Sequence, residues 1–148
     1  MIALGSDHGG FKLKEEIKKY LEELGIEYKD FGTYDEERTD YPIFAEKVAK
    51  AVQSKECEKG ILICKSGAGM TITANKFKGI RAALAINEEM AKFSKLDDDV
   101  NIIVFPAQYI STSNAISATR TWIVTEFKMG RYQDRIQMIE KIENDNMK

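Results

Sequence analysis

The sequence predicts an α/β fold in which a five-stranded parallel sheet is covered by helices on both faces. Apolar runs typical of strands alternate along the chain with segments whose apolar residues recur at helical spacing, and the connections between them are short. The run "GILIC", residues 60–64, is hydrophobic throughout, as expected for a parallel strand buried on both faces. A chain of 148 residues has the usual size of one domain, so we expect a single domain over residues 1–148.

The first half of the chain contains three expected strands and two expected helices. The strands lie in residues 2–4, 26–32 and 60–64, and the helices lie in residues 13–24 and 42–52. The spacing of Leu13, Ile17 and Leu21 predicts the first helix, and Gly25 predicts its end. Pro42 stands where the second helix can begin.

The second half continues the alternation. We expect helices through residues 70–78, 88–95, 115–123 and about 131–145, and strands at residues 80–86 and 101–105. Ligands of such sheets bind outside the carboxyl ends of the strands. This rule brings the loops "SDHGG", "CKSGAG", "NEE" and "PAQ", and the long loop around residues 30–42, to one rim of the sheet.

Composition excludes several classes of protein. A net charge of -2 gives no electrostatic reason to expect nucleic acid or membrane binding, and no segment approaches the roughly 20 apolar residues of a membrane span. The N-terminus lacks the layout of a signal peptide. Cys57 and Cys64 are too few for a disulfide framework and lack metal-type spacing, so we expect no metal site and a reducing cytoplasmic location.

A loop of small residues follows the central strand. Ser66, Gly67, Ala68 and Gly69 would let backbone N–H groups approach an anion at a helix N-terminus. The alternative is a tight turn that only needs glycine. A dinucleotide-binding loop fits poorly, because its third glycine would fall at Ile72 and the motif does not follow the first strand.

Cys64 ends the central strand immediately before this loop. The positive end of a helix and the neighbouring Lys65 could lower its pKa and make a thiolate available as a base. The alternative is a buried, inert structural cysteine.

Other polar residues could also have either a functional or a purely structural role. His8 is the single histidine and could be an acid, a base, a phosphate ligand or only a loop hydrogen-bonding group, while Asp7 could orient it or bind a sugar hydroxyl. Arg131 and Arg135 share a helix face and could converge on a phosphate or form exposed salt bridges. The carboxylates of residues 97–99 favour a solvated segment over a cation site.

Taken together, several motifs resemble the family of type B ribose-5-phosphate isomerases and galactose-6-phosphate isomerase subunits. The motifs are "GSDHGG", "DFGT", "DYP", "GILIC-x-SGAGM", "ANKFKGIRAAL" and "GRYQDR". The resemblance implies a Rossmann-like three-layer α/β/α sandwich and a homodimer or tetramer with its active site at the subunit interface. It also implies interconversion of an aldose phosphate and a ketose phosphate without metal or cofactor, on ribose 5-phosphate or a six-carbon aldose 6-phosphate.

The resemblance also implies roles for individual residues. Cys64 would move a proton between C1 and C2 through a cis-enediolate, and the loop after it would stabilise the oxyanion. Arg131 and Arg135 would reach across the dimer interface and bind the substrate's phosphate in the active site of the partner subunit. The helix of residues 131–145 would pack on that subunit. The expected catalytic residues are Cys64, Ser66, His8 and Asp97, and the expected substrate-binding residues are Asp7, Tyr41, Lys65, Gly67, Ala68, Gly69, Asp98, Arg131 and Arg135.

The chain departs from the family pattern at the substrate rim. Many relatives have "HNDAN" where this chain has "DDDVN", so Asp97 replaces the histidine thought to open the sugar ring and Asp98 replaces its asparagine neighbour. Lys65 replaces a glycine, Gln108 replaces a phosphate-binding arginine, and "GGRH" has become "MGRY". These changes suggest altered specificity, with His8 or Asp97 opening the ring or a substrate that needs no such step. Lys65 could partly replace the lost positive charge.

The alternative function is non-catalytic. The same residues would suit a sugar-phosphate binding protein, or an inactive subunit of a hetero-oligomeric isomerase whose partner supplies the missing groups.

Overall fold

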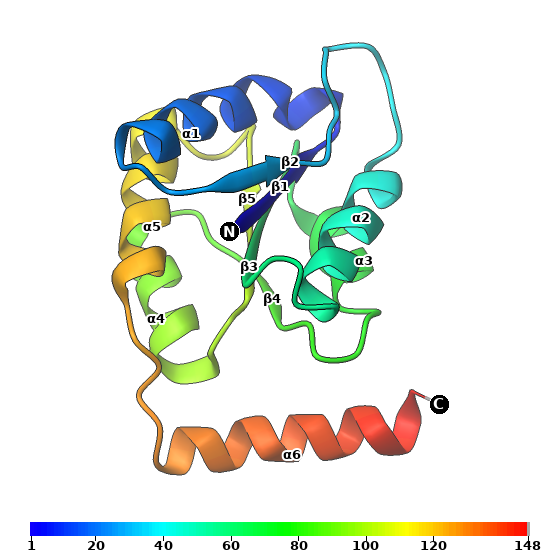
Figure 1. The fold of residues 1–148 in the computed structure, drawn as a ribbon, viewed down its shortest axis with the longest axis vertical. Coiled ribbons are helices and arrows are strands. Elements are labelled where there is room, and N and C mark those ends of the chain that lie inside the picture. The colour runs from blue at the N-terminus through cyan, green and yellow to red at the C-terminus, as the bar shows by residue number, and fades with distance from the viewer. Residues whose placement is uncertain (148) are drawn as a thin grey trace.

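A computed structural model describes residues 1–147 and contains the five parallel strands that the apolar runs predict (Figure 1). The strands are β1 (Ile2–Ser6), β2 (Tyr28–Asp30), β3 (Lys59–Cys64), β4 (Ala82–Leu84) and β5 (Ile102–Pro106). They pair in the order β2-β1-β3-β5-β4, and each neighbouring pair is parallel. The predicted α/β/α sandwich is confirmed.

Helices connect the strands and cover the sheet. They are the short 3-10 helix η1 (His8–Gly10), α1 (Phe11–Glu23), α2 (Tyr41–Gln53), α3 (Ala68–Ala74), α4 (Glu88–Asp98), α5 (Thr112–Val124) and α6 (Arg131–Asn146). Local signals set several starts: Pro42 lies in the first turn of α2, and the side chains of Asn87 and Ser111 cap α4 and α5. Every helix within residues 1–147 is too short or too polar to cross a membrane.

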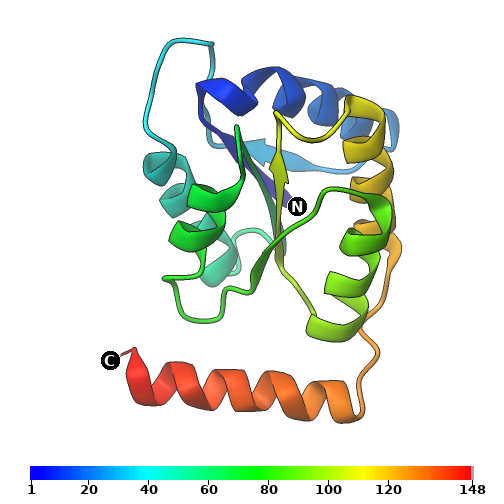
Figure 2. The ribbon, with the colours of Figure 1, turned by 180° about the vertical axis from the view of Figure 1, so that it is seen from behind.

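The alternation of side chains along the strands divides the core into two layers. Leu62 and Cys64 of β3 face α2 and α3, whereas Ile61 and Ile63 face the layer that includes α1 and α5. Figure 2 shows these two helical layers on opposite sides of the sheet. The side chain of Cys64 therefore points toward the α2 and α3 layer, next to Met70.

Three predicted elements are shorter than expected. The helix expected through residue 78 ends at Ala74, the strand expected over residues 80–86 is only Ala82–Leu84, and the strand expected over residues 26–32 is only Tyr28–Asp30. Asn75 explains the first difference, because its side-chain amide accepts from the N–H of Ala82 (2.8 Å) and donates to the carbonyl of Ala82 (2.9 Å). This pair of bonds holds the chain in a turn toward β4.

The topology creates two distinct ends. The carboxyl ends of β1, β3 and β5 lie at one edge of the sheet, while α4 runs back and finishes beside the amino ends of the strands. Helix α6 crosses the molecule at this second end (Figures 1 and 2). Both carboxylate oxygens of Glu143 accept from the N–H of Gly79, and these bonds anchor α6 to the loop before β4.

A buried ion cluster holds the loop that follows β2. Lys14 of α1 is fully buried and donates to both oxygens of Asp30 (2.6 and 2.7 Å) and to the carbonyl of Thr33 (2.7 Å). Lys18 donates to the same carboxylate at 2.9 Å. Burial acts to raise the pKa of Asp30, but the bonds from Lys14 and Lys18 outweigh it and hold that pKa below its usual range. The cluster fixes where the long loop leaves the sheet.

Replacing Lys14 with methionine should destabilise the protein by about 3 kcal/mol, because it removes one charge of a buried pair. Urea unfolding at neutral pH measures this change. The loss should begin to shrink as the pH falls below about 4, the ordinary value at which Asp30 of the unfolded chain takes up a proton, and it should disappear only below the lowered pKa of Asp30 in the folded protein.

Lys19→Met is the matched control on the same helix. Lys19 is exposed and pairs with the exposed Glu16, so its replacement should cost less than about 1 kcal/mol. Equal losses in the two variants would show that the Lys14 cluster does not stabilise the fold.

Candidate active site

Three strand ends meet around Cys64. Main-chain bonds join them: the N–H of Asp7 donates to the carbonyl of Ile63 (3.3 Å), and the N–H of Ala107 donates to the carbonyl of Cys64 (2.9 Å). The N–H of Gln108 donates to the carbonyl of Lys65 (3.0 Å). The loops after β1, β3 and β5 are therefore held together as one rim, as the parallel sheet predicts.

The sulfur of Cys64 lies among backbone donors. The N–H of Gly67 donates to its Sγ at 3.2 Å, and the N–H groups of Met70 and Ser66 also interact with it. Gly67 has φ +78°, and a Cβ there would overlap the side chain of Leu84, so the turn that aims this N–H at sulfur needs glycine. The small-residue loop thus surrounds the thiol itself.

Burial controls the protonation of Cys64. Burial raises the pKa of the thiol, the N–H donors of Met70 and Gly67 offset part of that effect, and the negative charge of Asp7 raises it further. The expected lowering is therefore wrong in direction. The side chain of Lys65 is exposed and α3 has only seven residues, so neither outweighs desolvation.

This environment has a chemical consequence. Near neutral pH the group is mainly a thiol, but a thiolate formed there is a stronger base than one with a lowered pKa. The surrounding N–H groups would stabilise its negative charge as it forms.

Tyr41 forms a wall of the rim. It is the first residue of α2, and its ring lies so close to α3 that a Cβ on Gly69 would overlap it. The absence of a side chain at Gly69 therefore lets the aromatic ring cover the first turn of α3. Ser66 has a local role as well, because its Oγ accepts from the N–H of Ala68 at 3.3 Å.

His8 and Asp7 are held by different partners. The N–H of Thr39 donates to Nδ1 of His8 at 3.2 Å, so neutral His8 carries its proton on Nε2. The carboxylate of Asp7 is largely buried and accepts from the N–H of Gly10 at 3.1 Å. The long loop, and not Asp7, orients the histidine.

Four predicted site residues lie at the other end of the molecule. Asp97 and Asp98 form the last turn of α4, while Arg131 and Arg135 form the first turns of α6. A five-residue strand separates the two ends of the sheet by about 15 Å or more. One chain therefore does not bring these four residues to Cys64.

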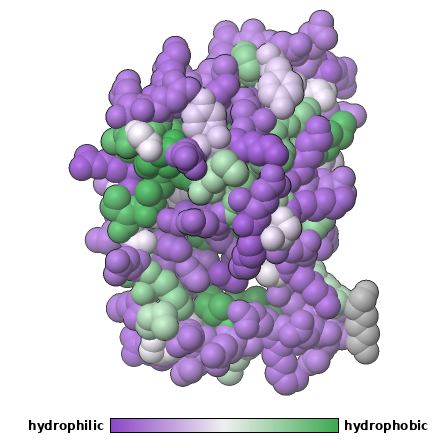
Figure 3. All heavy atoms as spheres, in the orientation of Figure 1, coloured by the Kyte–Doolittle hydropathy of each residue, from purple (hydrophilic) through white to green (hydrophobic). Residues whose placement is uncertain are grey.

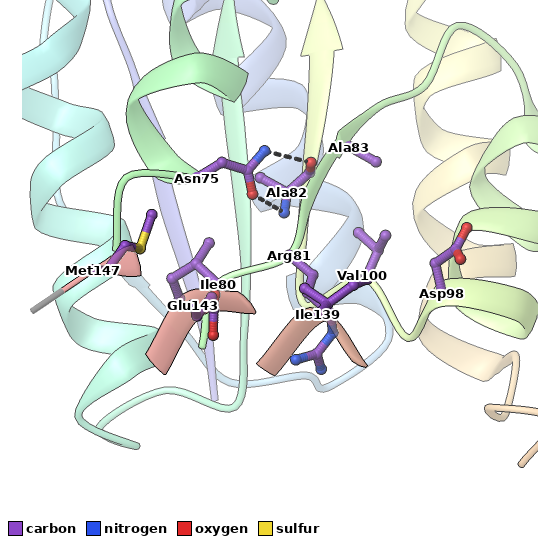
Figure 4. A pocket seen from close by; sticks show the side chains of 10 residues that line it. All are labelled: Asn75, Ile80, Arg81, Ala82, Ala83, Asp98, Val100, Ile139, Glu143 and Met147. Atoms are coloured by element: carbon purple, nitrogen blue, oxygen red, sulfur yellow. Dashed lines mark hydrogen bonds between the residues drawn. The ribbon is translucent and has the colours of Figure 1, made fainter. Parts of the chain in front are cut away.

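A pocket of about 410 Å³ also lies at this second end, between α6 and the sheet (Figure 4). Ile80, Val100 and Ile139 supply apolar walls, and Figure 3 shows apolar atoms between α6 and the domain above it. Three polar side chains of this pocket have partners: Asn75 bonds to Ala82, Arg81 to Asp99, and Glu143 to the N–H of Gly79. Apart from Asp98, the pocket contains none of the predicted site residues.

Sequence reasoning missed two residues that shape the rim. Thr39 and Met70 act through their main-chain N–H groups, and every residue except proline has such a group, so no side-chain pattern identifies them. Within residues 1–147 no group of three or more His, Cys, Asp or Glu side chains could hold a metal ion.

The raised pKa of Cys64 predicts slow alkylation by iodoacetamide near neutral pH, with a rate that keeps increasing above about pH 8.5, the ordinary thiol value. Intact-mass spectrometry of the Cys57→Ala variant measures this rate at Cys64 alone. A rate that reaches its plateau below about pH 7.5 would contradict the assignment.

Comparison with known proteins agrees with this geometry. A model of the family described as "Ribose/Galactose Isomerase" matches residues 2–139. Ribose-5-phosphate isomerase B of Escherichia coli is 42% identical over 142 residues, which cover 96% of this chain and 95% of the relative. The solved ribose-5-phosphate isomerase B of Clostridium thermocellum is 44% identical and superposes with a TM-score of 0.96 over 97% of both chains.

A second solved structure carries a ligand. Ribose-5-phosphate isomerase B from Mycoplasma genitalium, with bound ribulose-5-phosphate, is 33% identical to this chain and has a TM-score of 0.94, covering 98% of this chain and 97% of the other. The match extends over nearly the whole chain, in sequence and in fold. The protein belongs to the ribose/galactose isomerase family.

Proposed function

We propose that this protein interconverts an aldose phosphate and a ketose phosphate, with Cys64 as the base that moves the proton. The observation that carries the proposal is the position of the Cys64 sulfur. It ends the central strand of an isomerase-family fold and lies within a loop of backbone N–H donors. A positioned base beside preorganised donors is what an enediolate intermediate requires.

The reaction follows from these groups. The thiolate of Cys64 removes the proton from C2 of the open-chain aldose, and the electron pair moves through C1 to the carbonyl oxygen. Donors from the loop of residues 66–69 would stabilise the resulting enediolate. The proton of the O2 hydroxyl passes to O1, which becomes a hydroxyl. The electron pair left on O2 then forms the ketone C=O while Cys64 returns its proton to C1 and is a thiolate again. The step needs no external oxidant or reductant.

Ring opening requires an acid near the ring oxygen. His8 is the candidate within one chain, since the Thr39 bond directs the protonated Nε2 away from the loop main chain. Asp97 would reach the sugar only from a second copy, because it lies at the opposite end of its own sheet. His8, Asp7 and Tyr41 would thus contact the sugar from the rim.

A second copy would also supply the phosphate-binding arginines. Arg131, Arg135, Met138 and Ile142 recur at helical spacing along one face of α6. Met138 is 66% exposed and Ile142 is 65% exposed, so the arginines continue into an uncovered apolar stripe. This stripe supports a homodimer or tetramer in which α6 packs on its partner. Because a catalytic thiol must stay reduced, a cytoplasmic location suits the reaction.

The competing function is a non-catalytic sugar-phosphate binding protein or an inactive subunit. The carboxylate of Asp97 at the position of the family's ring-opening histidine and the raised pKa of Cys64 favour it. Such a protein would still bind the sugar phosphate but would not transfer the proton.

Turnover should be assayed with ribose 5-phosphate, allose 6-phosphate and galactose 6-phosphate. The wild type should isomerise at least one, and Cys64→Ala should lose about 100-fold or more of kcat, the usual contribution of a positioned base. Cys57→Ala is the matched control, because Cys57 is buried away from the rim and its loss should leave kcat unchanged within about twofold.

Calorimetry with the same sugars separates the two functions. A wild type that binds one sugar phosphate but isomerises none would be a binding protein. Equal activity in the wild type and Cys64→Ala would exclude the cysteine as the base.

A further inference from the structure

Tyr132 collects three positive side chains around one ring. The Nζ of Lys128 lies 4.8 Å from the ring centroid, and the guanidinium carbons of Arg131 and Arg135 each lie 5.2 Å from it. All three cations are exposed. Tyr132 stands where many relatives have the histidine of "GGRH", so this aromatic centre is a departure of this chain.

The three cations lack a close anionic partner. Within residues 1–147, none of them lies within 4.0 Å of a carboxylate. In contrast, Lys18 of α1, Lys95 of α4 and Lys141 of α6 each pair with a carboxylate of the same helix or of the residue that ends it. Asp97 is the acidic group that acts on Arg131 from α4, and Asp134 lies in the first turn of α6. The N-terminus of the 16-residue α6 adds further positive potential. An anion bound here would relieve repulsion among like charges.

The hydroxyl of Tyr132 is prepared to donate. It accepts from Nζ of Lys128 (3.4 Å) and from the guanidinium of Arg131 (3.3 Å), which occupies both of its acceptor positions. Its own proton must then point elsewhere. The bonds from Arg131 and Lys128 also lower the pKa of Tyr132, which makes its O–H a better donor to an oxyanion.

The main chain holds Lys128 in place. Its N–H donates to the carbonyl of Leu96 at 2.9 Å, immediately before Asp97 in the last turn of α4. The segment between α5 and α6 is therefore attached to the same turn that carries the two replaced residues, Asp97 and Asp98. Lys128 thus reaches the Tyr132 ring from a backbone position that the fold anchors.

We propose that Lys128 and the Tyr132 hydroxyl are ligands of a phosphate monoester dianion, completing a four-donor subsite with Arg131 and Arg135. The proposal rests on the proposed function for the sugar part of the substrate. At position 108 on the rim this chain has Gln108 where many relatives have a phosphate-binding arginine, and Lys128 would supply a positive charge in its place from the segment before α6. Tyr132 both orders the cations and donates directly.

Inorganic phosphate tests the subsite in the intact full-length protein, by calorimetry at low and constant ionic strength. Lys128→Gln should weaken phosphate binding about tenfold, since it removes a charged donor. Tyr132→Phe keeps the ring beneath the cations and removes only the hydroxyl, and should weaken binding about fivefold. Lys141→Gln is the matched control, because Lys141 lies on the same helix and pairs with Asp145. Its affinity should stay within about twofold of the wild type.

The KM and kcat for whichever sugar phosphate the protein isomerises complete the test. Lys128→Gln should raise KM with little change in kcat, as expected for a group that binds the ground state and the transition state equally. The subsite would be overturned if the wild type bound no detectable phosphate. It would also be overturned if Lys128→Gln and Tyr132→Phe both bound phosphate with wild-type affinity. Isomerase activity with an unchanged KM in Lys128→Gln would overturn it and leave the proposed function intact. Phosphate binding that depends on Lys128 in a protein without any isomerase activity would support the subsite and contradict the proposed function.

Discussion

The parallel register of β1, β3 and β5 is the constraint on which the candidate site depends. It brings the loops that carry Asp7, Cys64 and Gln108 to one edge of the sheet, where main-chain bonds join them. The same register sends α4 and α6 to the opposite edge. Cys64 and the arginine pair are therefore separated in one chain by the length of the strands, so the proposed site, which uses both, would require a second copy.

Cys64 shows how the fold sets reactivity through opposing effects. Desolvation and the charge of Asp7 keep the thiol protonated, while three backbone N–H groups act in the other direction. Such a group is mainly a thiol near neutral pH, and it is a strong base once it has lost its proton. The turn at Gly67 and the close approach of Tyr41 to Gly69 keep these donors in place.

Local patterns in the sequence were sufficient for most of the fold and for the position of the cysteine. The apolar run before Cys64 and the helical spacing of Leu13, Ile17 and Leu21 report burial directly, so these elements were predicted correctly. The predicted end of α3 was wrong because the helix stops where Asn75 bonds to Ala82 of β4, a contact between two elements that helical spacing does not report. The predicted direction of the Cys64 pKa shift was wrong because burial, which raises this pKa, depends on the tertiary structure and not on the neighbouring residues in the sequence. The bond from Thr39 to His8 leaves no trace in side-chain patterns.

The central claim is that each site combines the cysteine end of one chain with the arginine end of another. Mixing two inactive variants, Cys64→Ala and Arg131→Ala/Arg135→Ala, tests it most directly. In a two-fold dimer, random mixing in equal amounts should restore about a quarter of wild-type activity, because half of the dimers would contain one intact site. Mixed oligomers verified by mass spectrometry that stay inactive, or an arginine variant that is fully active alone, would contradict the claim.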